Sequence, residues 1–151
     1  MKYADFGSLA ETAARGLVAA GQAAKAHLPE PLLELVRLRA SLQNGCHFCI
    51  AMHTDRLQRL GVPTERIAAL PAWHEASVFE PRERAALALC DAVTRLSPAG
   101  VANSVYASAA ACFSPAEMAA LVTAIAVINA WNRISITFEF PPESALPKSA
   151  A

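Results

Sequence analysis

The sequence has 151 residues, of which 54% are hydrophobic and 17% are charged, and this much apolar surface excludes an intrinsically disordered chain. Its 13 basic and 13 acidic residues give a formal net charge of zero, so no excess of positive charge points to a nucleic-acid partner. The length suits one domain, and we predict a single compact domain over residues 1–151.

Helix-forming residues and capping signals occur along almost the whole chain, and no stretch alternates apolar and polar residues over the length of a strand. Ser8 and Glu11 have the spacing of a capping box and predict the start of the first helix. Ser114, Pro115 and Glu117 predict the start of the last long helix in the same way. We therefore predict an all-α domain of six to seven helices, over residues 8–27, 31–44, 46–60, 64–70, 81–96, 97–112 and 114–137.

The chain shows no sequence signal for export or for a membrane span. Residues 118–132 are uncharged but shorter than the roughly 20 residues that cross a bilayer, and the longer stretch 96–116 is interrupted by Pro98 and Gly100. The first residues include the charged Lys2, Asp5 and Glu11 and show no apolar segment of the kind found in a signal peptide. We expect a cytoplasmic protein with no membrane or nucleic-acid partner and with a loose tail at Pro141-Pro142.

Cys46 and Cys49 form a C-x-x-C pair across the first turn of a predicted helix, where two sulfurs are close enough for a disulfide. The unpaired N–H groups and the positive dipole end of a helix N-terminus favour thiolate over thiol. His53 lies four residues after Cys49 on the same helical face, so its imidazole can hydrogen-bond that sulfur directly or through a water. In a reducing compartment such a pair indicates redox or metal chemistry.

Glu34 is the candidate proton acceptor for His53. If Gly45 joins two antiparallel helices, Glu34 and His53 lie about 16 and 12 Å from the turn, which is within about one helical turn of the same height. The carboxylate can then hold the imidazole ready to take a proton from the thiol. The alternative role for Glu34 is an ion pair with Arg37 or Arg39.

The stretch 34–53 resembles the alkyl hydroperoxidase D-like branch of the carboxymuconolactone decarboxylase family. The thiol peroxidases of that family carry a glutamate, a C-x-x-C twelve residues later and a histidine four residues past the second cysteine. The resemblance extends over about residues 25–140, the expected core of the domain. It rests on Glu34, Cys46, Cys49 and His53 and on the flanking features Arg39-Ala40-Ser41, Asn44-Gly45-Cys46, Trp73 and Asn129-Ala130-Trp131-Asn132-Arg133.

The resemblance implies a thiol peroxidase of the antioxidant defence that needs no cofactor and no metal. In such an enzyme Cys49 attacks the peroxide, Cys46 closes a disulfide with it, and His53 and Glu34 relay protons. An external dithiol, either a lipoyl group or a thioredoxin-like protein, reduces the disulfide. Helix-dipole reasoning alone favours Cys46 as the attacking thiol, because it is nearer the helix end.

The sequence departs from the family pattern next to the second cysteine. Well-studied members have a histidine just before that cysteine, where this sequence has Phe48. The histidine of this sequence, His47, lies one position earlier, about 100° around a helix, and this difference bears on the efficiency of peroxide turnover.

Two other interpretations of the function stay open. The first alternative is a carboxymuconolactone decarboxylase-like enzyme or a disulfide reductase. The second is a non-catalytic redox-sensing or zinc-stabilised module, with the cysteine pair, His53 and either His47 or His74 as ligands.

Five further residues are assigned mainly structural roles. Cys90 and Cys112 lie in alanine-rich segments and are expected to behave as small buried hydrophobic residues. Trp73 and Trp131 are expected in the core or at an interface, and His74 is a weaker candidate for a substrate pocket.

The low content of charge predicts a homo-oligomer, because the chain has little polar surface to cover a monomer and its many alanines let helices approach closely. The resemblance implies a trimer or a hexamer. Light scattering at micromolar concentration should therefore give a multiple of 16.0 kDa. A particle of 16.0 kDa would contradict this prediction.

Overall fold

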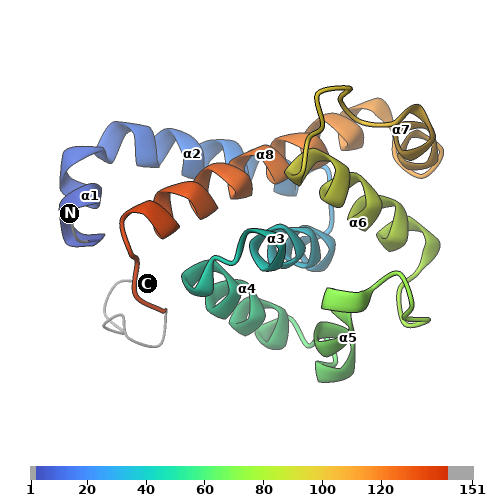
Figure 1. Cartoon of the computed structure of the whole chain (residues 1–151), viewed down its shortest axis with the longest axis horizontal. Coiled ribbons are helices and arrows are strands. Elements are labelled where there is room, and N and C mark those ends of the chain that lie inside the picture. Colours follow the sequence, from blue (N-terminus) through green and yellow to red (C-terminus); the bar gives the residue numbers. More distant parts are fainter. Residues whose placement is uncertain (1–2, 143–151) are drawn as a thin grey trace.

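The computed structural model describes residues 3–142, which form α-helices and two short 3₁₀ turns and contain no strand (Figure 1). The 3₁₀ turns are Ala24–Ala26 and Leu70–Ala72. The α-helices are α1 (Tyr3–Leu9), α2 (Glu11–Ala23), α3 (Glu30–Asn44), α4 (His47–Arg59), α5 (Thr64–Ala69), α6 (Pro81–Thr94), α7 (Asn103–Ala110) and α8 (Pro115–Thr137). The all-α class is confirmed, and the helices within the described residues number eight because the first predicted helix is divided in two.

The predicted start of the first helix at Ser8 is wrong. Ser8 lies inside α1, and the chain breaks at Ala10, whose φ of −124° and ψ of 29° are not helical. The break lets α1 place Phe6 against the other end of the chain, 5.1 Å from the ring of Phe138 and 5.9 Å from that of Phe140. A tertiary aromatic contact therefore overrides a local capping pattern.

The predicted helix over residues 97–112 begins late. Residues 97–100 form a tight turn in which Gly100 has a φ of 77° and the Ser97 hydroxyl donates to the Gly100 carbonyl (3.1 Å). The left-handed φ suits glycine, which has no Cβ to clash, and α7 starts at Asn103. Pro141 and Pro142, where a loose tail is predicted, belong to no helix, and residues 143–151 lie outside the described residues.

Helix α3 is the centre of the structure, packed against α4, α6 and α8 (Figure 1). A helix enclosed on most sides is normally apolar all round, but α3 also buries two charged residues and a serine. Such groups are tolerated only with partners. The buried residues of α3 are Leu32, Leu33, Glu34, Leu35, Val36, Arg37, Leu38, Ala40 and Ser41.

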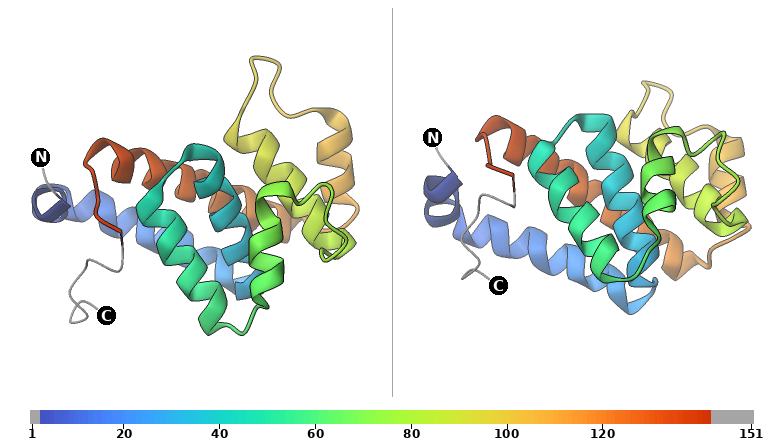
Figure 2. Two further views of the ribbon diagram at one scale, coloured as in Figure 1. Left: turned by 60° about the horizontal axis from the view of Figure 1, so that its bottom comes forward. Right: turned by 90° about the horizontal axis from the view of Figure 1, so that it is seen from below.

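Helix α8 covers one side of α3, and α2 packs along it (Figure 2). Among the described helices, α8 alone is long and apolar enough to cross a membrane. Its most apolar stretch of 18 residues has a mean hydropathy of 1.4, and 44% of that stretch is buried inside the structure. A core helix has the same composition, and the buried face of α8 (Met118, Leu121, Ile125 and Ile128) belongs to the main hydrophobic cluster.

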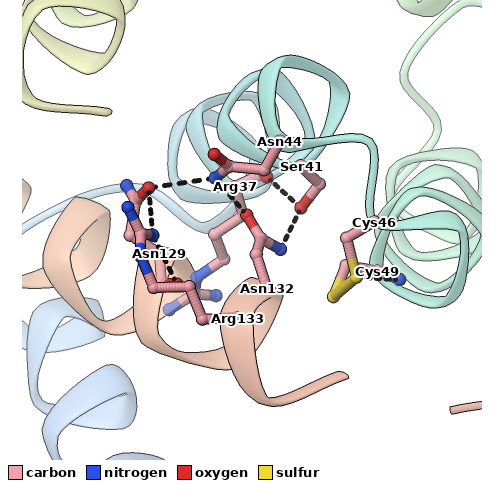
Figure 3. The surroundings of a disulfide bond; sticks show 8 residues. All are labelled: Arg37, Ser41, Asn44, Cys46, Cys49, Asn129, Asn132 and Arg133. Carbon is pink, nitrogen blue, oxygen red and sulfur yellow. Dashed lines mark hydrogen bonds between the residues drawn. A yellow bond between two sulfur atoms is a disulfide. The ribbon is translucent and has the colours of Figure 1, made fainter. Parts of the chain in front are cut away.

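A network of side-chain amides ties the end of α3 to α8 (Figure 3). The Asn44 amide donates to the side-chain carbonyls of Asn129 and Asn132, both at 2.9 Å. Asn132 in turn donates to the Ser41 hydroxyl (3.0 Å), which donates to the Arg37 carbonyl (2.8 Å). The network fixes the place from which the chain leaves α3.

The remaining predicted structural residues lie mostly where the sequence indicated. Trp73 is buried, and its indole N–H donates to Asp91 (3.1 Å), which also pairs with Arg39 (2.7 Å), so Arg39 is not the partner of Glu34. His74 stacks on Trp73 with its side chain 62% exposed and does not line the pocket described below. Cys90 is buried and Cys112 half-buried.

Candidate active site

A single glycine turns the chain from α3 into α4. Gly45 has a φ of 69°, and the Cys46 N–H donates to the Ser41 carbonyl (3.1 Å), as at a helix end with a left-handed residue. Cys46 is the N-cap of α4, and its Sγ accepts from the Cys49 N–H (3.3 Å). The two Cα atoms lie 5.3 Å apart, and the sulfurs form a disulfide (Figure 3).

Both cysteines are buried, but they differ in access. Cys46 is 1% exposed and Cys49 is 0% exposed. Cys49 lines a pocket, whereas Cys46 lies outside its lining. A small molecule that enters the pocket therefore meets Cys49 first.

The pocket has a volume of about 250 Å³ and lies between α2, α4 and α8. Most of its wall is apolar, and Trp131, expected in the core or at an interface, is half-buried in this wall. The apolar lining consists of Leu17, Val18, Phe48, Met52, Val127, Ile128, Trp131 and Phe140. The other lining residues are Gly21, Gln22, Arg37, Cys49, His53, Arg56 and Ser135.

The Glu34 carboxylate is fully buried and bound at both oxygens. Its Oε2 lies 2.6 Å from Nδ1 of His53, and its Oε1 lies 2.5 Å from a guanidinium nitrogen of Arg37. Arg37 also donates to the Gly21 carbonyl of α2 (2.8 Å). The structure thus joins the two roles weighed for Glu34, because the same carboxylate contacts the histidine and forms an ion pair.

The surroundings of Glu34 and His53 lower the pKa of both groups, which favours an ionised carboxylate beside a neutral imidazole. Burial alone would raise the pKa of Glu34, but the hydrogen bond and charge of His53 and the Arg37 guanidinium outweigh it and lower that pKa to about 2. Burial lowers the pKa of His53 below its usual 6.5, against the opposing effect of Glu34. At neutral pH an ionised Glu34 can only accept, so we assign the proton of a neutral His53 to Nδ1.

The other nitrogen of His53 is left as a base. Its Nε2 is buried and has no hydrogen-bond partner among the described residues, and the His53 side chain lines the pocket beside Cys49. Buried polar atoms without partners are uncommon and mark sites where a ligand or water binds. In this disulfide state no hydrogen bond joins Nε2 to the sulfur.

Arg56 is the site residue that the sequence analysis missed. It lies three residues after His53 on α4 and so shares its helical face, and its guanidinium is 3.9 Å from Glu34. His47 is exposed and lies outside the pocket lining. Within residues 3–142, no three His, Cys, Asp or Glu side chains are placed to hold a metal ion.

Glu34→Gln is expected to lower the free energy of unfolding by about 3–5 kcal/mol, because the buried Arg37 loses its counter-charge. The matched control is Glu11→Gln, which breaks an exposed pair with Arg15 and should cost at most about 1 kcal/mol. Urea unfolding followed by circular dichroism measures both. Equal, small effects would show that Glu34 does not compensate a buried charge.

Stability is expected to fall steadily as the pH is lowered from about 6.5 to about 2. The pKa of Glu34 in the folded protein is lowered from 4.5 to about 2. Between these two pH values the unfolded chain binds more protons than the folded protein, so lowering the pH stabilises the unfolded state relative to the native state. His53, with a folded pKa below 6.5, acts in the same direction at higher pH. Denaturant midpoints at a series of pH values test this, and a stability maximum near pH 4 would refute it.

Relatives of known sequence and structure agree with this architecture. Residues 10–92 match the carboxymuconolactone decarboxylase family. An uncharacterized protein, YdfG of Bacillus subtilis (strain 168), is 39% identical over 103 residues, which cover 68% of this chain and 70% of YdfG.

The crystal structure of ATU0492 from Agrobacterium tumefaciens superimposes with a TM-score of 0.86 at 33% identity, covering 95% of this chain and 98% of that one. ATU0492 is a protein of unknown function for which an AhpD-type role in antioxidant defence has been suggested. The debrominase Bmp8, solved with 2,3,4-tribromopyrrole, gives a TM-score of 0.73 at 22% identity, covering 86% of this chain and 68% of Bmp8, and shows the fold alone. The family match and these relatives confirm the predicted resemblance: the chain belongs to the carboxymuconolactone decarboxylase family and has an AhpD-like fold.

Proposed function

We propose that the protein is a cofactor-independent thiol peroxidase that works through Cys46 and Cys49. The supporting observation is the arrangement at the pocket, whose lining includes both Cys49 and a neutral His53 imidazole whose Nε2 has no partner among the described residues and whose Nδ1 is held by Glu34. A base so placed can take a thiol proton. The suggested antioxidant role of ATU0492 is consistent with this chemistry.

The first step oxidises Cys49. Nε2 of His53 takes the thiol proton, and Glu34 stabilises the imidazolium that forms. The thiolate attacks one peroxide oxygen and the O–O bond breaks; the leaving oxygen takes the proton from His53 and departs as water or an alcohol. The sulfur loses two electrons, the peroxide gains two, and Cys49 becomes a sulfenic acid.

The second step forms the disulfide. The Cys46 thiol attacks the sulfenic sulfur and releases water, which gives the bonded pair. An external dithiol then exchanges with the disulfide, restores both thiols and is itself oxidised to a disulfide. Because Cys49 lies in a pocket of about 250 Å³, a slender lipoyl arm fits this role better than the surface of a thioredoxin-like protein.

The lining of the pocket supports Cys49 as the attacking cysteine. The helix-dipole argument favours Cys46, but both cysteines are buried, and Cys49 lines the pocket together with His53 whereas Cys46 does not. A peroxide that arrives through the pocket therefore reaches Cys49. A disulfide reductase would use the same pair without consuming peroxide.

Mutants of the two cysteines test the proposal. Cys46→Ser should consume one equivalent of peroxide and stop at a sulfenic acid on Cys49, since no neighbouring thiol remains to condense with it. Cys49→Ser should scarcely react. Dimedone labelling followed by peptide mass spectrometry distinguishes the two.

The buried Cys90 is an internal control in both mutants, because burial raises the pKa of its thiol to about 12 and it should stay unlabelled. Label on Cys46 in the Cys49→Ser protein, with none on Cys49 in the other, would reverse the order. Label on neither would exclude peroxidase chemistry and favour the reductase.

A further inference from the structure

The charged groups around the pocket do not balance. Arg37 and Arg56 are the charged residues in its described lining, and Glu34 is the carboxylate they share, at 2.5 and 3.9 Å. The neighbouring carboxylate on α4, Asp55, is paired with Arg59 at 2.7 Å. Two guanidinium groups against one carboxylate leave one positive charge in excess.

The two arginines have different surroundings. The Arg37 side chain is 10% exposed and held by Glu34 on one side and by the Gly21 carbonyl on the other. The Arg56 side chain is 47% exposed, and its contact with Glu34 at 3.9 Å is longer than a hydrogen bond. Arg37 is therefore a structural cation, whereas the guanidinium of Arg56 keeps donors for a ligand.

Depth in the pocket separates the reacting groups from Arg56. Cys49 and His53 are 0% and 2% exposed, so they lie at the inner end, and the half-exposed Arg56 lies at the mouth. Seven residues of α4 separate Cys49 from Arg56, which corresponds to about 10 Å along the helix. Between them the wall is apolar, formed by side chains such as Met52 and Trp131.

We propose that the pocket takes amphipathic organic hydroperoxides that carry a carboxylate at the end remote from the hydroperoxide group, and that this carboxylate pairs with Arg56. A guanidinium matches a carboxylate with two parallel hydrogen bonds, and the apolar wall binds the hydrocarbon between the two ends. The proposal rests on the thiol peroxidase function: the hydroperoxide is reduced to an alcohol at Cys49, and the carboxylate is unchanged.

A matched substrate pair tests the role of Arg56. For a hydroperoxy fatty acid and its methyl ester, the acid should be preferred by about tenfold in kcat/KM, the lower end expected for a charge-assisted pair, because the guanidinium is half-exposed to solvent. Arg56→Gln should bring the ratio to about one, and Arg56→Lys should keep part of it. The ratio cancels any general loss of activity in the variants.

The control variant is Arg59→Gln, one turn nearer the end of α4, with its side chain 78% exposed and outside the pocket lining. It should keep the acid preference of the wild type. The dithiol step is tested separately with dihydrolipoate and dihydrolipoamide, which differ in the same charge. A carboxylate preference confined to the dithiol would overturn the proposal, as would a ratio that Arg56→Gln leaves unchanged.

Binding separates this proposal from the peroxidase function. Calorimetry with the corresponding hydroxy acid and its ester needs no turnover and should show the same preference for the acid. Acid preference in binding without peroxide consumption would support the assignment of Arg56 and refute the peroxidase. Equal binding of acid and ester, with normal turnover of both, would refute the assignment of Arg56 alone.

Discussion

The carboxylate of Glu34, buried in the central helix, is the constraint on which the rest of the site depends. It stays ionised although it is buried, because His53 and Arg37 bind its two oxygens. Each partner is then held in one place: Arg37 donates to the Gly21 carbonyl, and His53 lines the pocket with its Nε2 free of partners among the described residues. One charge thus connects α2, α3 and α4, and the arrangement that suits proton transfer is also a condition of the fold.

The parts of the site that the sequence predicted depend on local geometry. The spacing of Cys46, Cys49 and His53 follows from the helical repeat, and the closeness of Glu34 follows from one short turn at Gly45. Both are properties of a continuous stretch of twenty residues. Sequence reasoning is strongest where distances are fixed by the chain itself.

The parts that it missed depend on contacts between distant segments. The pocket wall combines Leu17 of α2 with Trp131 of α8, and no local pattern states that these helices meet around Cys49. The break after α1 has the same origin, because the contact of Phe6 with Phe138 is gained only if the helix at Ser8 does not continue. Arg56 lies three residues after His53, so the sequence places it on the same helical face, but its role depends on where the pocket opens to solvent.

The asparagine network gives α8 a defined register along α3. Alanine-rich surfaces are smooth, and a helix can slide along one by a turn with little loss of apolar contact. The amide network prevents such a slide, because displacement would leave the buried Asn132 and the half-buried Asn44 without their partners. Trp131 adjoins Asn132 in sequence, so the same hydrogen-bond network also positions this part of the pocket wall relative to Cys49. Substitution of single side chains in the wall can therefore change the shape of the pocket while the distance between α8 and the thiol stays the same.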